Sequence, residues 1–560
     1  MNPRANKHLL LWSSVATFLL LATAAFRENV LQEWRRLQRG YESRRPAAQA
    51  ADFDVQLRQV VVPTLHAADR CVSCHVGMAA GESGIQGQPI YAKHANVVHD
   101  PAEFGCTVCH GGQGRATERA AAHGDVHHWP EPMIPARFAT AGCGTCHTHL
   151  EVPSLATLEH GKALVERYDC LACHKLDGRG GTLRTGGAGG MEGPDLSRVG
   201  ATGYDRDWYA HHQAQRDTSR VAAWRASFAV VPERDREAID VVLRSRVGAR
   251  GLVESKALFH SLGCRGCHKV GGIGGDDGPD LTRIGQMDPG QRSFTHVDGA
   301  RSVENWLAEH FRKPASVVPG SQMPELGLSE EQIEQLTFYM LSLRRSNLPE
   351  AYWPKDRVRA ERFGEREFAS DGATIYGTFC AACHGPSGEG MRYPGMVAFP
   401  AIGSPDFLSL ASDDFLRMTV THGRPGRRMA AWGESGGGLR PAEIDSVVAY
   451  VRALGGGLQP EPDTRPARWV QGDPALGARL YAANCASCHG KSGEGGEGAA
   501  LANPNLLQYA TDTYLVETIR RGRRGSSMLG FGTGSVTRRS LSQAEIEAIV
   551  AHIRSWEAHP

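Results

Sequence analysis

The arrangement of the cysteines constrains this chain more than any other feature. All 14 cysteines among its 560 residues lie in Cys-x-x-Cys-His strings, and none is left over. Histidine accounts for only 24 residues, so seven histidines directly after such pairs do not arise by chance. The seven strings are Cys71, Cys74 and His75; Cys106, Cys109 and His110; Cys143, Cys146 and His147; Cys170, Cys173 and His174; Cys264, Cys267 and His268; Cys380, Cys383 and His384; and Cys485, Cys488 and His489.

This spacing suits the covalent attachment of haem c. One helical turn brings both thiols to the two vinyl groups of one haem, and the imidazole of the next residue then reaches the iron. A zinc site would need a second pair of ligands nearby, and a thioredoxin-like dithiol would need a βαβ context. Neither accompanies these strings. The sequence therefore predicts seven covalently bound haem c groups, each held by two cysteines and one proximal histidine.

Length and composition predict several mainly helical domains. A chain of 560 residues is too long for one hydrophobic core. With 66 glycines, 30 prolines and 7% aromatic residues, it should form short helices joined by long loops rather than sheets. The formal charge of +1 becomes negative once seven haems add their propionates, which argues against nucleic acid as a partner.

Four internal repeats fill residues 156–560. Each begins with a short amphipathic helix that leads into a motif: "GKALVERYDCLACH", "SKALFHSLGCRGCH", "GATIYGTFCAACHG" and "GARLYAANCASCHG". Each ends with a second helix: "REAIDVVLRSRV", "EEQIEQLTFYMLSL", "AEIDSVVAYVRAL" and "AEIEAIVAHIRSW". We call these repeats units 4 to 7, after the motif that each carries.

The four units resemble class I cytochromes c. The resemblance implies two helices that cross beside the haem, a proline near the proximal histidine, and a methionine in a later loop as the sixth iron ligand. Prolines 194, 279, 400 and 504 stand at the corresponding positions. The methionines that match are Met323 for the haem on His268, Met429 for that on His384 and Met528 for that on His489.

Unit 4 departs from this pattern because its distal stretch, "RDTSRVAAWRASFAVVPE", contains no methionine. His212 in "DWYAHHQAQ" aligns with His310 in "NWLAEHFRK", so we expect His212 as the sixth ligand, with His211 and Met191 as alternatives. A histidine in place of methionine would lower the reduction potential, whereas an empty position would leave room for chemistry on a small molecule.

Residues 71–150 hold three motifs without the paired helices, and resemble multihaem cytochromes c. Such density leaves no separate core for each haem, so the haems should pack against one another. Seven histidines are available for three sixth positions: His66, His94, His99, His123, His127, His128 and His149. We expect His94, His99 and His123 to be the ligands.

The N-terminus predicts a membrane anchor. Residues 9–25 are uncharged and mostly apolar, about the minimum length for a bilayer span. A cleaved signal peptide is the alternative, with Ala22 and Ala24 as a small-x-small site. The charged helix that follows favours a retained anchor with a stalk. The arginines after the span favour a cytoplasmic location, but in the proteins this chain resembles haem attachment follows export. We therefore expect a single span in the cytoplasmic membrane and periplasmic haem domains.

The expected organisation is mainly α-helical, with these boundaries: an anchor and stalk at 1–50, a trihaem domain at 51–155, unit 4 at 156–249, unit 5 at 250–348, a linker and unit 6 at 349–456, and a linker and unit 7 at 457–560. In this linear order, a low-potential triad is followed by an unusual fourth haem and then by three His/Met haems of higher potential.

The predicted function is electron transfer within a membrane respiratory complex. The donor would be a quinol-oxidising or cytochrome b-type membrane subunit, and the acceptor a soluble cytochrome or terminal oxidase. Arginines 427, 428, 523 and 524 would dock an acidic partner or remain ordinary solvated charges. One alternative is a redox enzyme with an open fourth haem that acts on a small molecule. Another is a polymerising cytochrome wire.

Overall fold

A computed structural model describes residues 3–45, 53–181, 193–214, 230–344, 347–524 and 526–557. The chain is mainly helical, as predicted. The strands in the described part form two short antiparallel pairs. β1 (Val60–Val62) pairs with β2 (Ala67–Asp69), with Val61 opposite Ala68, and β3 (Lys175–Leu176) pairs with β4 (Arg179–Gly180).

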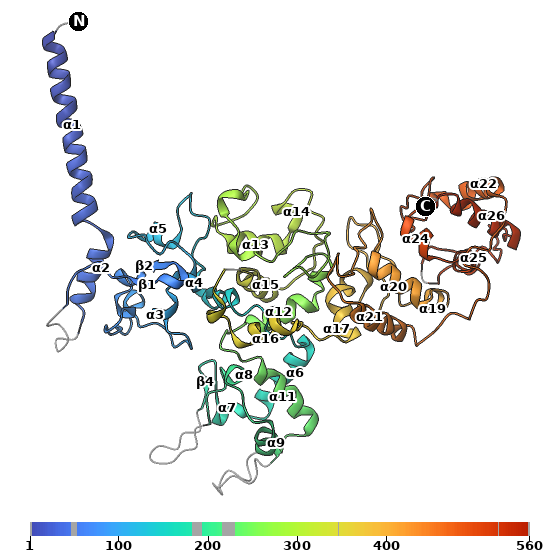
Figure 1. The fold of residues 1–560 in the computed structure, drawn as a ribbon, viewed down its shortest axis with the longest axis horizontal. Helices are drawn as coiled ribbons and strands as arrows, with labels where there is room; N and C mark the ends of the chain where they lie inside the picture. Colours follow the sequence, from blue (N-terminus) through green and yellow to red (C-terminus); the bar gives the residue numbers. More distant parts are fainter. Residues whose placement is uncertain are drawn as a thin grey trace.

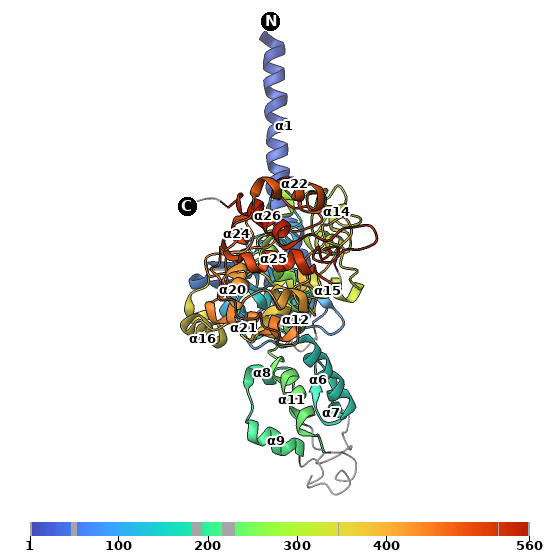
Figure 2. The ribbon, with the colours of Figure 1, turned by 90° about the vertical axis from the view of Figure 1, so that its right-hand side faces the viewer.

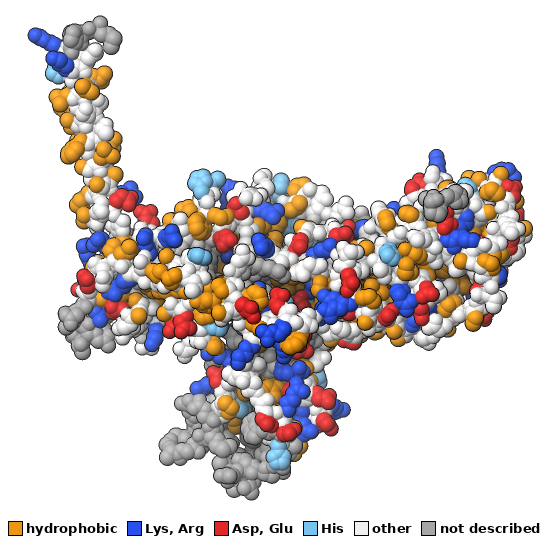
Figure 3. All heavy atoms as spheres, in the orientation of Figure 1, with side chains coloured by type: hydrophobic (Ala, Val, Ile, Leu, Met, Phe, Trp, Pro, Cys, Tyr) orange, Lys and Arg blue, Asp and Glu red, His pale blue; other side chains and the backbone are white. Residues whose placement is uncertain are grey.

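The N-terminal helix α1 (Pro3–Val30) extends away from the body (Figure 1). It is apolar over most of its length, whereas the body has a mixed charged surface (Figure 3). Among the described residues, this is the one helical segment long and apolar enough to cross a membrane, although a signal sequence would pass the same test. The helix therefore fits both a retained membrane anchor and a cleaved signal peptide.

The stalk expected after the span is instead docked on the body. The chain bends after Val30, and α2 (Glu33–Glu42) buries Trp34, Gln38 and Tyr41 against the trihaem domain. The amide of Gln38 donates to the carbonyl oxygens of Gln56 (2.8 Å) and Ser73 (3.0 Å). Helix α1 can therefore cross a bilayer while α2 and the trihaem domain stay outside it.

The trihaem domain is built from short turns rather than from helices that could form a core. Its helical segments are η2 (Pro63–Leu65), η3 (Cys71–Ser73), η4 (Val76–Met78), η5 (Pro89–Tyr91), α3 (Pro101–Phe104), α4 (Thr107–His110), α5 (Arg119–His123) and η6 (Ala136–Thr145). Its buried apolar cluster is small, consisting of Val76 and Tyr91 together with Tyr41 of α2. The domain therefore has little apolar core of its own, as the density of motifs predicts.

Units 4 to 7 share one frame, a pair of packed helices at the start and end of each unit. The pairs are α6 (Leu155–Arg167) with α11 (Glu233–Arg244), α12 (Leu252–Ser261) with α15 (Glu330–Ser342), α17 (Gly372–Phe379) with α21 (Pro441–Leu454), and α22 (Pro474–Asn484) with α26 (Gln543–Arg554). Glycines 161, 372 and 477 allow close crossing, because a Cβ at each would collide with a backbone carbonyl of the partner helix. The helix pairs predicted from the sequence are confirmed.

Shorter elements complete each unit. Unit 4 has α7 (Cys170–Cys173), α8 (Val199–Thr202) and α9 (Arg206–Ala214). Unit 5 has η8 (Cys264–Gly266), η9 (Ile284–Gln286), η10 (Pro289–Gln291), α13 (Val303–Arg312) and α14 (Pro314–Val317). A linker with η11 (Glu350–Tyr352) and α16 (Lys355–Phe363) leads to unit 6, with α18 (Ala381–His384), α19 (Pro405–Leu408) and α20 (Asp413–His422). Unit 7 has α23 (Ala486–His489), α24 (Pro504–Tyr509) and α25 (Asp512–Arg521).

The units do not follow the linear order of the sequence in space. The trihaem domain and units 5, 6 and 7 form a row, and unit 4 projects from it on the side opposite to α1 (Figures 1 and 2). Element η6 of the trihaem domain packs directly on α15 and α12 of unit 5. Unit 4 is therefore a side lobe rather than a link between the trihaem domain and unit 5.

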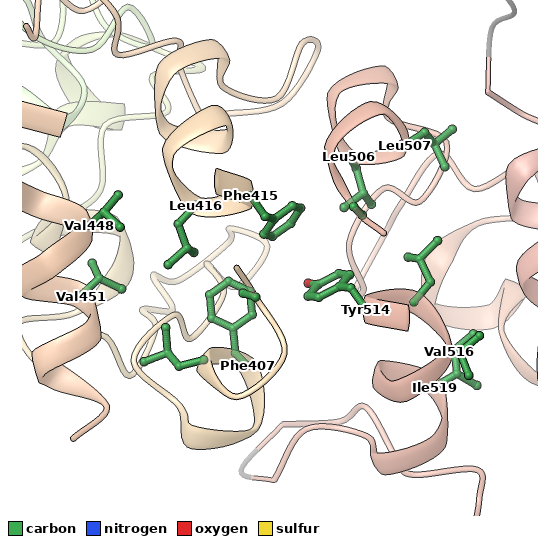
Figure 4. Close-up of a cluster of buried hydrophobic side chains, with 14 of the residues drawn as sticks. Phe407, Phe415, Leu416, Val448, Val451, Leu506, Leu507, Tyr514, Val516 and Ile519 are labelled. Carbon is green, nitrogen blue, oxygen red and sulfur yellow. The ribbon is translucent and has the colours of Figure 1, made fainter. Parts of the chain in front are cut away.

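Units 6 and 7 share a continuous apolar core. Figure 4 shows Phe407 and Phe415 of unit 6 pointing toward Tyr514 of unit 7. The ring centres of Phe415 and Tyr514 lie 4.8 Å apart, and those of Phe407 and Tyr514 lie 6.5 Å apart. Because this interface is apolar and closely packed, the two units form one block rather than two domains swinging on a linker.

We expect Gly477→Ala to destabilise unit 7, because the new methyl group would collide with the carbonyl of Ala548 on α26. Overpacking of this kind costs about 1–3 kcal/mol of unfolding free energy. Gly377→Ala on α17 is the matched control, since its Cβ would meet nothing within 4 Å. Thermal unfolding of the two variants measures the difference. An equal melting temperature for both would contradict this account of the helix crossing.

Candidate haem-binding sites

All seven motifs adopt the same backbone turn. In each, the amide of the histidine donates to the carbonyl oxygen of the first cysteine, four residues earlier, at 2.8 Å for His75, 2.9 Å for His384 and 3.0 Å for His110, His147, His174, His268 and His489. This is the helical turn that the spacing predicts. No cysteine of the chain forms a disulfide, so none of the 14 thiols is consumed by a cross-link.

The sulfur of Cys488 in the seventh motif has a polar neighbour. The hydroxyl of Ser487 donates a hydrogen bond to Sγ of Cys488 at 3.8 Å. Sulfur is a weak acceptor, and a thioether sulfur keeps its lone pairs. This contact is therefore compatible with the haem attachment that the sequence predicts at Cys485 and Cys488.

In units 4 to 7, a backbone carbonyl fixes the ring of the proximal histidine. The Nδ1–H group donates to the carbonyl of Pro194 for His174 (2.9 Å), Pro279 for His268 (2.8 Å), Pro400 for His384 (2.9 Å) and Ala499 for His489 (2.8 Å). The expectation for Pro504 is wrong, because that proline begins α24. Since Nδ1 donates in this way, Nε2 of each ring is free for a metal.

In the trihaem domain, the structure places three other histidines opposite the proximal ones. The ring centres lie 6.5 Å apart for His75 and His123, 6.1 Å for His110 and His94, and 6.3 Å for His147 and His99. Two imidazoles on opposite sides of one metal, each with a nitrogen–metal bond of about 2 Å, have ring centres roughly 6 Å apart. The side chains present therefore fit three six-coordinate haems.

The remaining histidines of this domain have other neighbours. His127 and His128 contact each other, with ring centres 5.0 Å apart, and Nδ1 of His149 lies 2.8 Å from the hydroxyl of Thr148. His66 ends η2 in the left-handed backbone region, at φ 52°. Within the described part of the chain, the rings that face the three proximal histidines are thus those of His94, His99 and His123.

In unit 4, too, a second histidine ring lies opposite the proximal one. His212 on α9 lies with its ring centre 6.1 Å from that of His174, at an interplanar angle of 87°. Of the two alternatives, His211 is exposed on the same helix and Met191 lies outside the described residues. The spacing fits a metal between His174 and His212.

The methionines expected in units 6 and 7 lie in equivalent turns. The amide of Arg424 donates to the carbonyl of Met429 (2.8 Å), and the amide of Arg523 donates to that of Met528 (2.9 Å). Both methionine side chains are partly buried against the core shared by the two units. Met323 is partly buried against the core of unit 5.

Burial favours the neutral form of five proximal histidines. Desolvation is the main cause that lowers the pKa of His75, His110 and His147, and the facing histidine lowers it further. Burial likewise lowers the pKa of His268 and His384. Neutral imidazole is the form that binds a metal.

Among the described residues, no group of three or more His, Cys, Asp or Glu side chains forms a separate metal site.

Comparison with known protein families matches three of the four repeats. Residues 252–344 match the family described as cytochrome c, and residues 367–451 and 472–553 match cytochrome C oxidase, cbb3-type, subunit III. These segments are cytochrome c domains. They correspond to units 5, 6 and 7, and the chain as a whole is a multihaem c-type cytochrome with a candidate N-terminal membrane helix.

Curated relatives are subunits of cbb3 oxidases. The chain is similar to the cbb3-type cytochrome c oxidase subunit FixP of Bradyrhizobium sp. (strain ORS 278), at 36% identity over 28% of this chain and 51% of that protein. It is also similar to FixP of Azorhizobium caulinodans (31% identity; 33% and 59%) and CcoP of Rhodobacter capsulatus (30%; 33% and 61%). The chain thus spans about half to three fifths of these relatives.

A solved structure gives a weaker similarity. The Kuenenia stuttgartiensis reducing HAO-like protein complex matches with a TM-score of 0.23 and 18% identity, over 33% of this chain and 96% of that chain. This score is too low to indicate a shared fold.

Successive motifs lie directly against one another within the trihaem domain and between units 5 and 6. The sulfur of Cys71 lies beside that of Cys106, and the sulfur of Cys267 in unit 5 lies beside that of Cys383 in unit 6, where a Cβ on Gly263 would collide with Ala382. In the trihaem domain, a Cβ on Gly142 would collide with the carbonyl of Cys109, so the second and third motifs also touch. The first, second and third motifs thus form one contiguous group, and the fifth and sixth another.

The arginines considered as a docking patch instead join cytochrome c domains to each other. Arg428 forms an ion pair with Asp277 of unit 5, and Nη1 of Arg427 donates to the carbonyl of Glu494 in unit 7 (3.2 Å). Arg524 of unit 7 pairs with Asp406 of unit 6 (2.9 Å). Arg523 lies over the ring of Phe407 in unit 6 at 4.7 Å. Pairing across domain boundaries was invisible in the linear sequence, and docking of an acidic partner by these arginines stays a prediction.

A buried ionic cluster joins the trihaem domain to units 5 and 6. Nζ of Lys256 lies 2.6 Å from the carboxylate of Glu367 and donates to the carbonyl of Leu150 (2.9 Å). Arg265, which is 0% exposed, pairs with the same carboxylate and donates to the carbonyl of Val270 (2.7 Å). Because Arg265 lies between Cys264 and Cys267, the cluster touches the fifth motif. Sequence reasoning missed it, although an arginine inside a motif was a visible signal.

The charge on Glu367 depends on its partners. Burial alone would raise its pKa, but Lys256, Arg265 and His260 lower it well below the ordinary value of 4.5. The ionised carboxylate therefore stabilises the fold fully above about pH 4.5, and this stabilisation is lost only gradually as the pH falls from that value toward the much lower pKa of the folded state.

We expect Glu367→Gln to loosen the contact among these three domains, because it leaves Lys256 and Arg265 as buried cations without a carboxylate. Breaking a buried pair costs about 3–5 kcal/mol. Glu365→Gln is the control, since Glu365 pairs with Arg359 on the surface, where a pair is worth up to about 1 kcal/mol.

Denaturant unfolding at pH 7 and pH 4 measures both variants. The difference between Glu367→Gln and the parent should shrink only slightly at pH 4, because the folded parent keeps Glu367 ionised there and only the unfolded chain takes up protons. A loss of stability equal to that of Glu365→Gln at both pH values would contradict the assigned role of the cluster.

Proposed function

We propose that this chain binds seven haem c groups and serves as an electron-transfer subunit of a membrane respiratory complex. Its donor is a quinol-oxidising or cytochrome b-type membrane subunit, and its acceptor is a soluble cytochrome or terminal oxidase. The observation that carries this proposal is the direct contact between successive motifs, within the trihaem domain and between units 5 and 6. The relation of units 6 and 7 to cbb3 oxidase subunits supports it.

The opposed histidine rings and the loop positions of the methionines support the proposed ligands. Each motif contributes two cysteine thioethers and the histidine after them. The sixth ligands are His123 opposite His75, His94 opposite His110, His99 opposite His147, His212 opposite His174, Met429 for the haem on His384 and Met528 for the haem on His489. Unit 5 offers two candidates, Met323 and His310.

Bound haem supplies reversible one-electron chemistry at iron. The protein would hold each iron by the proximal imidazole, whose orientation is fixed in units 4 to 7 by a backbone carbonyl. Histidine as the sixth ligand favours a lower potential than methionine does. Electrons therefore favour the methionine-ligated end, in units 6 and 7.

The contacts between domains suggest a route for electrons, with unit 4 as a side branch. Motifs one, two and three touch in turn, the third motif lies in η6 on unit 5, and the fifth motif touches the sixth. Unit 4 meets the trihaem domain where the guanidinium of Arg198 donates to the carbonyl of Asn96, between His94 and His99. We infer a main route through the row of domains, with unit 4 attached beside the second and third motifs.

Helix α1 would anchor this row in the cytoplasmic membrane, with the haem domains on the periplasmic side. The helix is exposed throughout its apolar length, and α2 holds the trihaem domain next to it. The trihaem domain is therefore the part that a membrane partner would reach first.

We expect quinol to reduce the haems only when the chain is assembled with its membrane partner. The comparison is between membrane preparations and the purified chain, with haem reduction followed by absorbance. A variant in which a cleavable signal peptide replaces residues 1–30, so that the chain is still exported, is the control. It should keep its haems and be reduced by dithionite, yet fail to join the complex. Reduction of the purified chain by quinol alone would contradict the proposed role.

A redox enzyme with an open haem in unit 4 is the competing function. The position of His212 opposite His174 speaks against it, so the reduced wild-type protein should not bind carbon monoxide at this haem. His212→Ala should create one carbon monoxide site, whereas His211→Ala, on the same helix, should create none. Carbon monoxide binding by the wild-type protein would favour the enzyme instead.

A further inference from the structure

The sixth iron ligand in unit 5 can be chosen from two side chains. Met323 lies in a Pro-Gly-x-x-Met string, as Met429 does in unit 6. His310 lies on α13 and aligns with His212 of unit 4, in "NWLAEH" and "DWYAHH". Unit 5 thus combines the methionine of the later units with the histidine of unit 4.

The turn around Met323 differs from the turns around the other two methionines. In units 6 and 7, the residue five positions before the methionine closes the turn by donating its amide to the methionine carbonyl. In unit 5 that residue is Val318, and its amide donates to the carbonyl of Pro314, at the start of α14 (2.9 Å). The loop around Met323 keeps two bonds that the loop around Met528 also has, from the amide of Ser321 to the carbonyl of Val318 (2.9 Å) and from the amide of Met323 to the hydroxyl of Ser321 (3.2 Å). It lacks the bond to the methionine carbonyl that closes the turns around Met429 and Met528.

His310, in contrast, is held by rigid surroundings. Its ring stacks on that of Trp306, with centres 5.0 Å apart and an interplanar angle of 8°. Helix α13 is anchored by the buried side chains of Val303, Trp306, Leu307 and Phe311, and it packs on α15. A ring fixed in this way loses little conformational freedom when it binds a metal.

The ring of His310 is neutral, and its Nδ1 accepts or donates no hydrogen bond among the described residues. Burial lowers its pKa to about 4, and an electrostatic interaction with the proximal His268 lowers it in the same direction. Its Nδ1 is buried without a hydrogen-bond partner among the described residues, as is Nδ1 of the proximal histidines His75 and His147. The position of His212, 6.1 Å from His174, shows that a histidine at this helix position reaches the distal side of a motif.

We propose that His310, and not Met323, is the sixth ligand of the fifth haem. The inference rests on the proposed function only in requiring that the fifth motif carries haem. Five haems then have two histidine ligands and two have methionine. Since methionine raises the potential relative to histidine, the rise in potential falls between units 5 and 6, where Cys267 meets Cys383.

Magnetic circular dichroism of the oxidised full-length protein tests this proposal, because the near-infrared signal of ferric haem differs between His/His and His/Met ligation. We expect two methionine-ligated equivalents in the wild type. Met323→Leu should leave the spectrum unchanged. His310→Leu should remove one His/His equivalent, which is replaced either by a high-spin signal or by a third methionine-ligated equivalent.

Three methionine-ligated equivalents in the wild type, reduced to two by Met323→Leu and unchanged by His310→Leu, would overturn the proposal. The haem content of each variant is measured separately, by the mass of the intact chain. A wild-type mass with fewer than seven haems would contradict the proposed function instead, so the two failures are distinguishable.

Discussion

The helical turn of the Cys-x-x-Cys-His motif is the element on which the rest of the structure depends. It brings two thiols and one imidazole to the same side of the backbone in every one of the seven sites. Covalent attachment allows a haem to serve as part of the hydrophobic core. This explains why the trihaem domain has only a small apolar cluster of its own, around Tyr41, Val76 and Tyr91. It also explains how three motifs fit where three separate cores would not.

Contacts between domains determine what the seven sites can do together. An apolar core joins units 6 and 7, and the buried carboxylate of Glu367 joins units 5 and 6 to the trihaem domain. The arginines beside Met429 and Met528 add pairs across the same boundaries. Charged groups that look like a docking patch in the sequence are thus used within the chain, where they favour a fixed arrangement of the motifs.

Local patterns predicted local features well, and long-range placement poorly. The helix pairs of units 4 to 7 followed from apolar periodicity, and His94, His99, His123 and His212 do lie opposite proximal histidines. The lateral position of unit 4 could not be predicted, because it depends on η6 packing against α15 of a later unit. Pro504 was misassigned because Ala499 supplies the carbonyl that the family pattern assigns to a proline.

The central claim is that the chain acts as one connected relay. Rapid photoreduction of a small fraction of the haems in the full-length protein, followed by absorbance, tests it most directly. The account predicts that the electrons redistribute to the methionine-ligated haems in a first-order process that does not depend on protein concentration. Redistribution whose rate rises with protein concentration would show that electrons move between molecules, and would contradict the claim.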